Sequence, residues 1–250
     1  MSGSARVVVI AQARMGSTRL PGKGLVDLVG KPLTERVLER AARSTLADEV
    51  VLATTDLPSD DGLAASVEAL GFRVVRGSSE DVLARYARAA EESDADVIVR
   101  ITCDCPFVEP WLIDRAATAV AGGEFDYATN TLVRSYPIGL DVEAFTRAAL
   151  VSAHAEAHEP HEREHVTPFI YQHPTRFRLH NLTAPGWATY PVWRLTVDTA
   201  EDLVVARLLY AELPDRFTLA DAVEAVLDNP AALEANSRVQ HKHVAKPEAW

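Results

Sequence analysis

The sequence contains little cysteine and little lysine. Its 250 residues include two cysteines, Cys103 and Cys105, and four lysines against 21 arginines. Two cysteines so close together cannot form a disulfide framework, so we expect a reducing, cytoplasmic setting. No apolar run approaches the roughly 18 residues of a membrane span. No apolar secretion core precedes the first predicted strand, and we therefore expect neither a membrane segment nor a signal peptide.

The overall composition is that of a globular protein. Hydrophobic residues make up 48% and charged residues 24% of the chain, which excludes a disordered or fibrous protein. The formal net charge of −11 makes nucleic acid an improbable partner, because such binding needs a positive surface. We find no linker or internal repeat. We therefore expect one domain over residues 1–250, with a core at about 6–213 and a helical extension at 214–250.

Short β-branched apolar runs alternate with amphipathic segments in the first half of the chain. The runs predict buried strands at 7–11, 50–54, 72–75 and 97–101, and the segments predict helices at 33–44, 60–70, 81–92 and 110–120. This alternation is typical of a parallel sheet covered by helices on both faces.

The pattern is looser after residue 126. It predicts strands at 127–132, 140–145, 176–182 and 192–197, and helices at 146–158, 161–173, 199–212, 218–227 and 230–237. Thr199 and Asp202 resemble a capping box at the start of the helix over 199–212, so we assign Asp202 to structure.

A basic loop follows the first predicted strand. Residues 12–24 contain three cations, Arg14, Arg19 and Lys23, together with a hydroxyl pair and glycines. Ligands of open α/β sheets bind outside the carboxyl ends of the strands. Glycines let backbone amides approach phosphate oxygens, arginines grip them in pairs, and lysine adds a point charge. The loop therefore predicts a polyphosphate site, and the alternative is a solvated basic surface loop.

Two aspartates follow predicted strands. Asp104 comes after the strand at 97–101, and Asp198 comes after the one at 192–197. An aspartate in this place suits a hard cation that bridges phosphate oxygens, and two on neighbouring strands could hold one Mg²⁺ together. The alternative is a turn or helix-capping aspartate.

Four further motifs follow in the chain: Gly77 with 81–86, Asp104-Cys105-Pro106, 162–168 and 194–198. Together with the basic loop they resemble the cytidylyltransferases that make CMP-activated acidic sugars, whose signature reads A-R-x-G-S-x-R-x-P-G-K. The resemblance covers about residues 7–212. It is nearest to the spore-coat polysaccharide biosynthesis F branch of the CMP-Kdo and CMP-neuraminate synthetase superfamily.

The resemblance implies a fold and an activity. The fold is a Rossmann-like nucleotide-diphospho-sugar transferase fold, with a mostly parallel mixed sheet and helices on both faces. The activity is Mg²⁺-dependent transfer of CMP from CTP to an acidic sugar or phosphonate-type acceptor, with release of pyrophosphate. The resemblance also implies a homodimer.

The resemblance assigns roles to individual residues. Those that would bind the nucleotide are Ala11, Ala13, Arg14, Gly16, Ser17, Arg19, Lys23, Gly77, Ser78 and Asp81. Those that would act in the transfer are Arg14, Lys23, Asp104 and Asp198, of which the two aspartates would hold Mg²⁺. Those that would bind the acceptor are Glu164, His165 and Arg194.

Two positions depart from the relatives. Cys103 stands where the F branch usually has glycine, and Thr102 where the Kdo enzymes have glutamine. The acceptor contacts of the Kdo enzymes therefore do not transfer to this chain. Two alternatives stay open: a nucleotidyltransferase for another sugar or polyol phosphate, and a non-catalytic nucleotide-binding relative.

Four histidines, His154, His158, His161 and His165, lie among glutamates. His161 and His165 are four residues apart, a spacing that could place two metal ligands on one helical face. No H-E-x-x-H pattern is present, so we favour acceptor binding or a solvated face over a zinc site. Trp187 and Tyr190 are candidates for an acceptor pocket.

Overall fold

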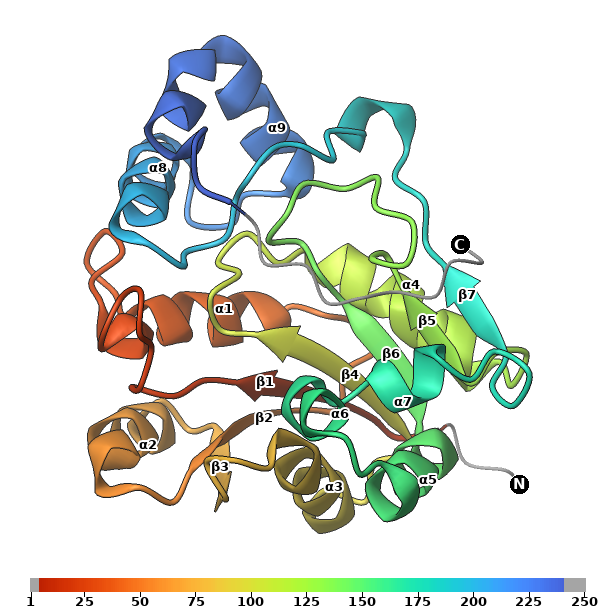
Figure 1. Cartoon of the computed structure of the whole chain (residues 1–250). Helices are drawn as coiled ribbons and strands as arrows, with labels where there is room; N and C mark the ends of the chain where they lie inside the picture. The colour runs from red at the N-terminus through yellow and green to blue at the C-terminus, as the bar shows by residue number, and fades with distance from the viewer. Residues whose placement is uncertain (1–4, 241–250) are drawn as a thin grey trace.

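The computed structural model describes residues 5–240, and its strands form one seven-stranded sheet in the order β3-β2-β1-β4-β6-β5-β7 (Figure 1). The strands are Val7–Gln12 (β1), Glu49–Thr55 (β2), Arg73–Gly77 (β3), Val97–Thr102 (β4), Tyr127–Thr129 (β5), Glu143–Thr146 (β6) and Leu179–Asn181 (β7). The first four run parallel, whereas β6 is antiparallel to both β4 and β5. The predicted mostly parallel mixed sheet is confirmed.

Helices cover both faces of the sheet. They are Leu33–Ala41 (α1), Asp61–Ala69 (α2), Val82–Glu92 (α3), Pro110–Ala121 (α4), Arg147–Glu156 (α5), Pro160–His165 (α6), Pro168–Tyr171 (α7), Ala200–Glu212 (α8) and Leu219–Asp228 (α9). Short 3-10 helices lie at Lys23–Leu25, Pro58–Asp60, Gly186–Ala188 and Pro230–Asn236.

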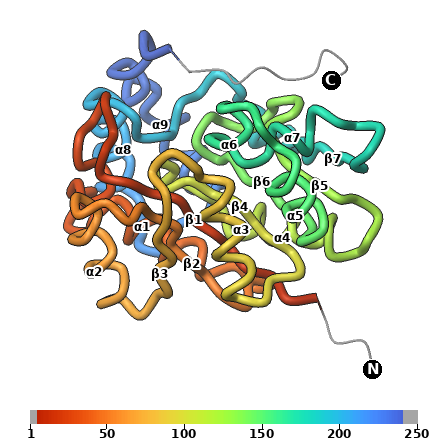
Figure 2. Tube along the Cα trace, turned by 60° about the horizontal axis from the view of Figure 1, so that its bottom comes forward, coloured from red at the N-terminus to blue at the C-terminus, as the bar shows by residue number. Residues whose placement is uncertain are grey.

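The side chains of β1 alternate between two hydrophobic cores. Val7 and Val9 pack with α1 and α4 on one face, and Val8 and Ile10 pack with α3 and α5 on the other. Figure 2 shows α3 and α5 side by side over the second face. With both faces buried, the polar ends of the strands are the part of the sheet that is open to a ligand.

Two predicted elements are wrong. Residues 192–197 form no strand, because Arg194 makes only an isolated bridge to Ile138 and the following residues bond to Asp104 instead. The helix predicted at 161–173 is broken into α6 and α7 at Val166, whose φ of 73° cannot continue a helix.

The segments after α8 pack back onto that helix. Thr199 and Asp202 form the expected capping box at its start. The helix predicted at 230–237 is a 3-10 helix over Pro230–Asn236, and Asn236 donates hydrogen bonds to Asp202 and to the backbone oxygen of Arg194. The last ten residues of the predicted extension lie outside the described residues. None of the helices within residues 5–240 has the length and apolarity to cross a membrane.

Candidate active site

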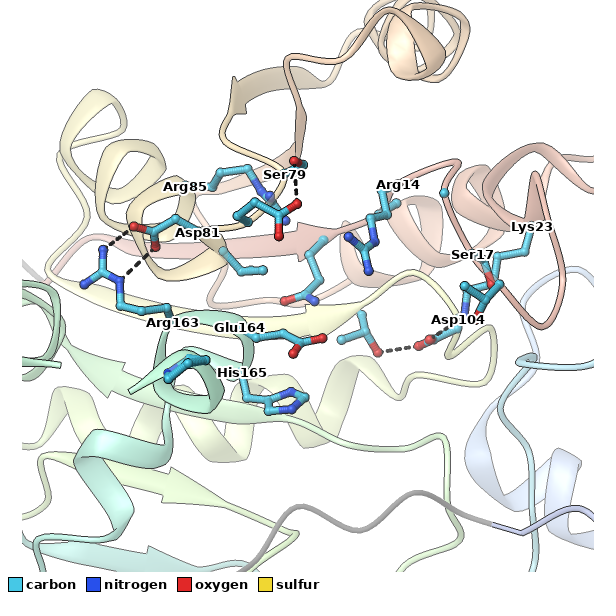
Figure 3. A pocket seen from close by; sticks show the side chains of 18 of the residues that line it. Arg14, Ser17, Lys23, Ser79, Asp81, Arg85, Asp104, Arg163, Glu164 and His165 are labelled. Carbon is cyan, nitrogen blue, oxygen red and sulfur yellow. Dashed lines mark hydrogen bonds and ion pairs between the residues drawn. The ribbon is translucent and has the colours of Figure 1, made fainter. Parts of the chain in front are cut away.

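A cavity of about 820 Å³ opens at the carboxyl ends of β1 and β4 (Figure 3). The basic loop forms one wall, and the start of α3 and the helix α6 form the opposite wall. Eleven of the predicted site residues line it: Ala13, Arg14, Gly16, Ser17, Arg19, Lys23, Asp81, Asp104, Glu164, His165 and Asp198. The structure thus brings the polyphosphate loop, both aspartates and part of the predicted acceptor segment to one place.

The Lys23 ammonium lies between the two aspartates. Its Nζ is 2.8 Å from Oδ2 of Asp104 and 2.9 Å from Oδ1 of Asp198. Burial by itself would lower the pKa of Lys23, but the two carboxylates outweigh it and raise that pKa above its usual value. Burial likewise opposes ionisation of Asp104, yet the ammonium and the Thr102 hydroxyl hold its pKa below the usual range. The two carboxylates thus face each other across a single cation, the Lys23 ammonium.

Hydrogen bonds to the carbonyl oxygen of Asp104, rather than strand pairing, place Asp198 beside Asp104. The backbone N–H of Val197 donates to the carbonyl oxygen of Asp104 at 2.7 Å, and the Thr196 hydroxyl donates to the same oxygen at 3.0 Å. Gly139 makes room for this segment, because a Cβ there would lie 2.5 Å from the backbone nitrogen of Thr196. Asp198 therefore reaches the carboxyl end of β4 from outside the sheet.

Arg194 lies behind Asp198 and does not line the cavity described above. Its buried guanidinium pairs with both oxygens of Asp202, at 2.7 and 2.9 Å, and its NH2 lies 3.0 Å from Oδ2 of Asp198. Asp202 also accepts the backbone N–H groups of Asp198 and Thr199. This geometry orients Asp198, whereas acceptor binding by Arg194 stays a prediction.

The basic loop is held by a residue that the sequence did not single out as functional. Oδ1 of the buried Asp60 accepts the backbone N–H of Met15 at 2.8 Å, and its other oxygen accepts the hydroxyls of Thr54 and Thr55. Burial alone would raise the pKa of Asp60, but these donors hold it below the usual value. Arg14, in the same loop, is exposed and has no ion-pair partner within residues 5–240.

The wall opposite the basic loop contains Arg163, a second residue that sequence reasoning missed. Asp81 caps α3 by accepting the backbone N–H of Ala84, and both its oxygens pair with the guanidinium of Arg163, at 2.5 and 3.1 Å. Arg163 lies inside the motif at 162–168, which is the signal that could have identified it. The ion pair joins α3 to α6 across the end of the cavity.

Three of the predicted nucleotide-binding residues lie just behind the cavity wall. Ala11 is fully buried in β1, Gly77 is the last residue of β3 and Ser78 follows it, and none of the three is among the residues that line the cavity. Their neighbour Arg85 lines it and donates to the backbone oxygen of Ser78. A role for these residues through their backbone stays a prediction.

Glu164 and His165 reach the cavity from the end of α6. Burial lowers the pKa of His165, against a smaller opposing effect of Glu164. Of the other histidines His158 also lines the cavity, and no group of three metal-ligating side chains occurs within residues 5–240. Trp187 and Tyr190 lie away from this cavity, and Tyr190 stacks on Trp193 at 3.7 Å.

Comparison with known proteins decides the family. A profile described as cytidylyltransferase matches residues 8–234. The chain belongs to the cytidylyltransferase family. It is therefore a nucleotidyltransferase enzyme, and the resemblance drawn from its motifs is confirmed. A regulatory protein without catalytic residues is not supported, since the cations and carboxylates of the motifs meet in one cavity.

Full-length relatives support the assignment. This cytidylyltransferase is 38% identical over 215 residues to the spore coat polysaccharide biosynthesis protein SpsF of Bacillus subtilis, which covers 84% of this chain and 88% of that one. Its structure superimposes on a cytidylyltransferase from Leptospira borgpetersenii with a TM-score of 0.88 and 30% identity, over 96% and 100% of the two chains.

A third relative matches over a shorter stretch. The 3-deoxy-manno-octulosonate cytidylyltransferase of Geobacter metallireducens is 41% identical over 113 residues, which are 44% of this chain and 43% of that enzyme.

Proposed function

We propose that this cytidylyltransferase transfers CMP from CTP to an acidic sugar or a phosphonate and releases pyrophosphate. The observation that carries the proposal is the lining of the cavity, which has the basic loop on one wall and Glu164 and His165 on the other. The name of the Geobacter relative supports CTP and a sugar acid as substrates.

The chemistry follows from charge. An acceptor oxygen attacks the α-phosphorus of CTP in line with the leaving group, so that one P–O bond forms as the bond to the β-phosphate breaks. Arg14 has no ion-pair partner within residues 5–240, and it lines the same cavity as Arg19 and Lys23. These cations would stabilise the charge that develops on departing pyrophosphate. An ionised phosphonate oxygen needs no base, which makes such an acceptor chemically simple.

We further propose that Asp104 and Asp198 hold Mg²⁺ during the reaction. Mg²⁺ in nucleotide sites takes one or two carboxylates and completes its octahedron with phosphate oxygens and water. Two carboxylates that already converge on one ammonium, each within 2.9 Å of it, fit this requirement. When bound, the ion would neutralise phosphate charge near the attacked phosphorus.

The direct test is pyrophosphate release. Purified enzyme with CTP and Mg²⁺ should release pyrophosphate only when an acceptor from a panel of acidic sugars and phosphonates is added. Chelation by EDTA should abolish turnover. If the enzyme bound ATP or GTP as tightly as CTP, the cytidine assignment would be wrong.

We also propose a homodimer, on the strength of the family resemblance. Light scattering on the purified chain should then give about twice the 27.2 kDa of one protomer. A mass equal to one protomer at assay concentrations would reject this proposal.

A further inference from the structure

A strained turn lies directly beside the acceptor wall of the cavity. Val166, which follows Glu164 and His165, has φ 73° and ψ −53°, and the backbone N–H of Thr167 donates to the oxygen of His165 at 2.9 Å. These values define the rarer and more strained of the two γ-turns, and a β-branched residue is seldom found in it. Such a conformation persists only where surrounding contacts enforce it.

The contacts that enforce this turn come from a buried polar network in the sheet. The hydroxyl of Thr167 donates to Oε1 of Glu143 at 2.6 Å, and the hydroxyl of Tyr127 donates to the same oxygen at 2.5 Å. Oε2 of Glu143 pairs with Arg100, its cross-strand neighbour on β4. Val166 is fully buried, and Thr167 and Glu143 are nearly so. The turn is thereby fixed to β6 and β4.

A second contact fixes α6 through Arg163, which lies inside the helix. Arg163 pairs with Asp81 at the start of α3, on the nucleotide side of the cavity. Between these two anchors lie Glu164 and His165, and Figure 3 shows the Glu164 carboxylate directed toward the side of the cavity that carries Asp104. A short helix that is anchored directly before and shortly after these two residues can keep their side chains in one orientation.

We infer that the turn at Val166 and its anchor, the hydroxyl of Thr167 on Glu143, position Glu164 and His165 for the acceptor. Thr167 and Glu143 are thus positioning residues, and neither is among the residues that line the cavity. The inference rests on the proposed function, because it names the residues that orient the acceptor wall. A purely structural contact would stabilise the fold without selectively affecting this wall.

The test compares three variants around one carboxylate oxygen. Thr167→Val removes the anchor, Thr167→Ser keeps it, and Tyr127→Phe removes the second hydrogen bond to Oε1 of Glu143 without touching the turn. Tyr127→Phe is the matched control, because it removes one hydrogen bond from Oε1 of Glu143, as Thr167→Val does. Thermal unfolding of each variant reports how much stability is lost in general.

The first measurement needs no acceptor. NMR titration of the His165 ring, assigned with His165→Gln, reports its surroundings, which include Glu164, Arg100, Glu143 and His161. We expect Thr167→Val to move the pKa of His165 back toward its ordinary value, with Thr167→Ser and Tyr127→Phe unchanged. Equal shifts in Thr167→Val and Tyr127→Phe, or none in either, would overturn the inference.

The second measurement uses whichever acceptor of the panel supports pyrophosphate release. We expect Thr167→Val to raise the KM for that acceptor about ten-fold or more, since a hydrogen bond to a charged group is lost, with the KM for CTP unchanged. Equal rises in both KM values would overturn the inference. If the wild-type enzyme failed to bind CTP, the proposed function would be wrong. The His165 titration would still test whether the turn at Val166 positions His165.

Discussion

Replacing Lys23 by methionine should both destabilise the enzyme and create a better binding site for a free divalent cation. Lys23 lies 2.8 and 2.9 Å from the carboxylates of Asp104 and Asp198. Asp198 would keep Arg19 at 3.2 Å and Arg194 at 3.0 Å after the change. Asp104 has no other ion-pair partner within residues 5–240, so its charge would be the one left uncompensated.

The expected loss of stability follows from the unpaired charge of Asp104. Removing a charged partner from a partly buried hydrogen bond costs about 2 kcal/mol of unfolding free energy. A domain of this size loses about 2–4 °C of Tm for each kcal/mol, so we expect Lys23→Met to melt about 4–8 °C lower without metal. Methionine has a similar length, and the loss would therefore reflect charge rather than volume.

The assay is thermal unfolding with and without Mg²⁺, in the absence of nucleotide. If the two aspartates hold Mg²⁺ as proposed, the cation would have to displace the ammonium in the wild type, whereas in Lys23→Met the Asp104 carboxylate would have no competing cation within residues 5–240. A ligand at a hundred times its dissociation constant stabilises a fold by about 2.7 kcal/mol, so Mg²⁺ should restore most of the lost Tm in the variant. Lys31→Met, which removes an exposed lysine paired with Glu35 and Glu39, is the control. Equal effects of Mg²⁺ on the wild type and Lys23→Met would refute the reasoning.

Three further predictions concern the same site. Asp198→Asn should keep Tm within a few degrees and lose most pyrophosphate release; near-normal turnover would reject the metal role. Gly139→Ala should lower Tm sharply, because its φ is 99° and its Cβ would meet Thr196 at 2.5 Å; an unchanged Tm would show that the segment moves freely. Because Lys23 holds the pKa of Asp104 below the unfolded value of 3.8, the stability that ionised Asp104 contributes is present above about pH 4 and lost as the pH falls below it. In urea unfolding the gap between wild type and Asp104→Asn should therefore shrink in acid, and a constant gap would contradict this.

The parts of the site whose position the sequence predicted belong to the parallel half of the sheet. A β-branched run such as Val7–Gln12 is buried on both faces, so its position and the loop that follows it can be read locally. The same holds for β4 and Asp104. In both cases one strand end determines where the functional side chain lies, and parallel order brings the ends together.

Asp198 shows why the position of other site residues could not be predicted from the local sequence. Its apolar approach, 192–197, has the composition of a strand, yet its partners are the backbone of Ile138 and the oxygen of Asp104, which are remote in sequence. Its place after this apolar run marked Asp198 as a candidate metal ligand, and the family resemblance gave it the same role, although the run forms no strand. Its position beside Lys23 depends on Gly139, whose missing Cβ admits the segment, and no local pattern reports such an approach.

The residues that sequence reasoning missed share a physical property: each is an anchor for a different segment. Asp60 looks like an ordinary helix start, but its buried carboxylate holds the loop 45 residues earlier through the backbone of Met15. Arg163 looks like one more charge in a charged helix, but it ties α6 to Asp81. A substrate-facing residue leaves a local signature because its chemistry is fixed by the ligand. An anchor is defined by its partner, so its role becomes visible only when the two segments are seen together.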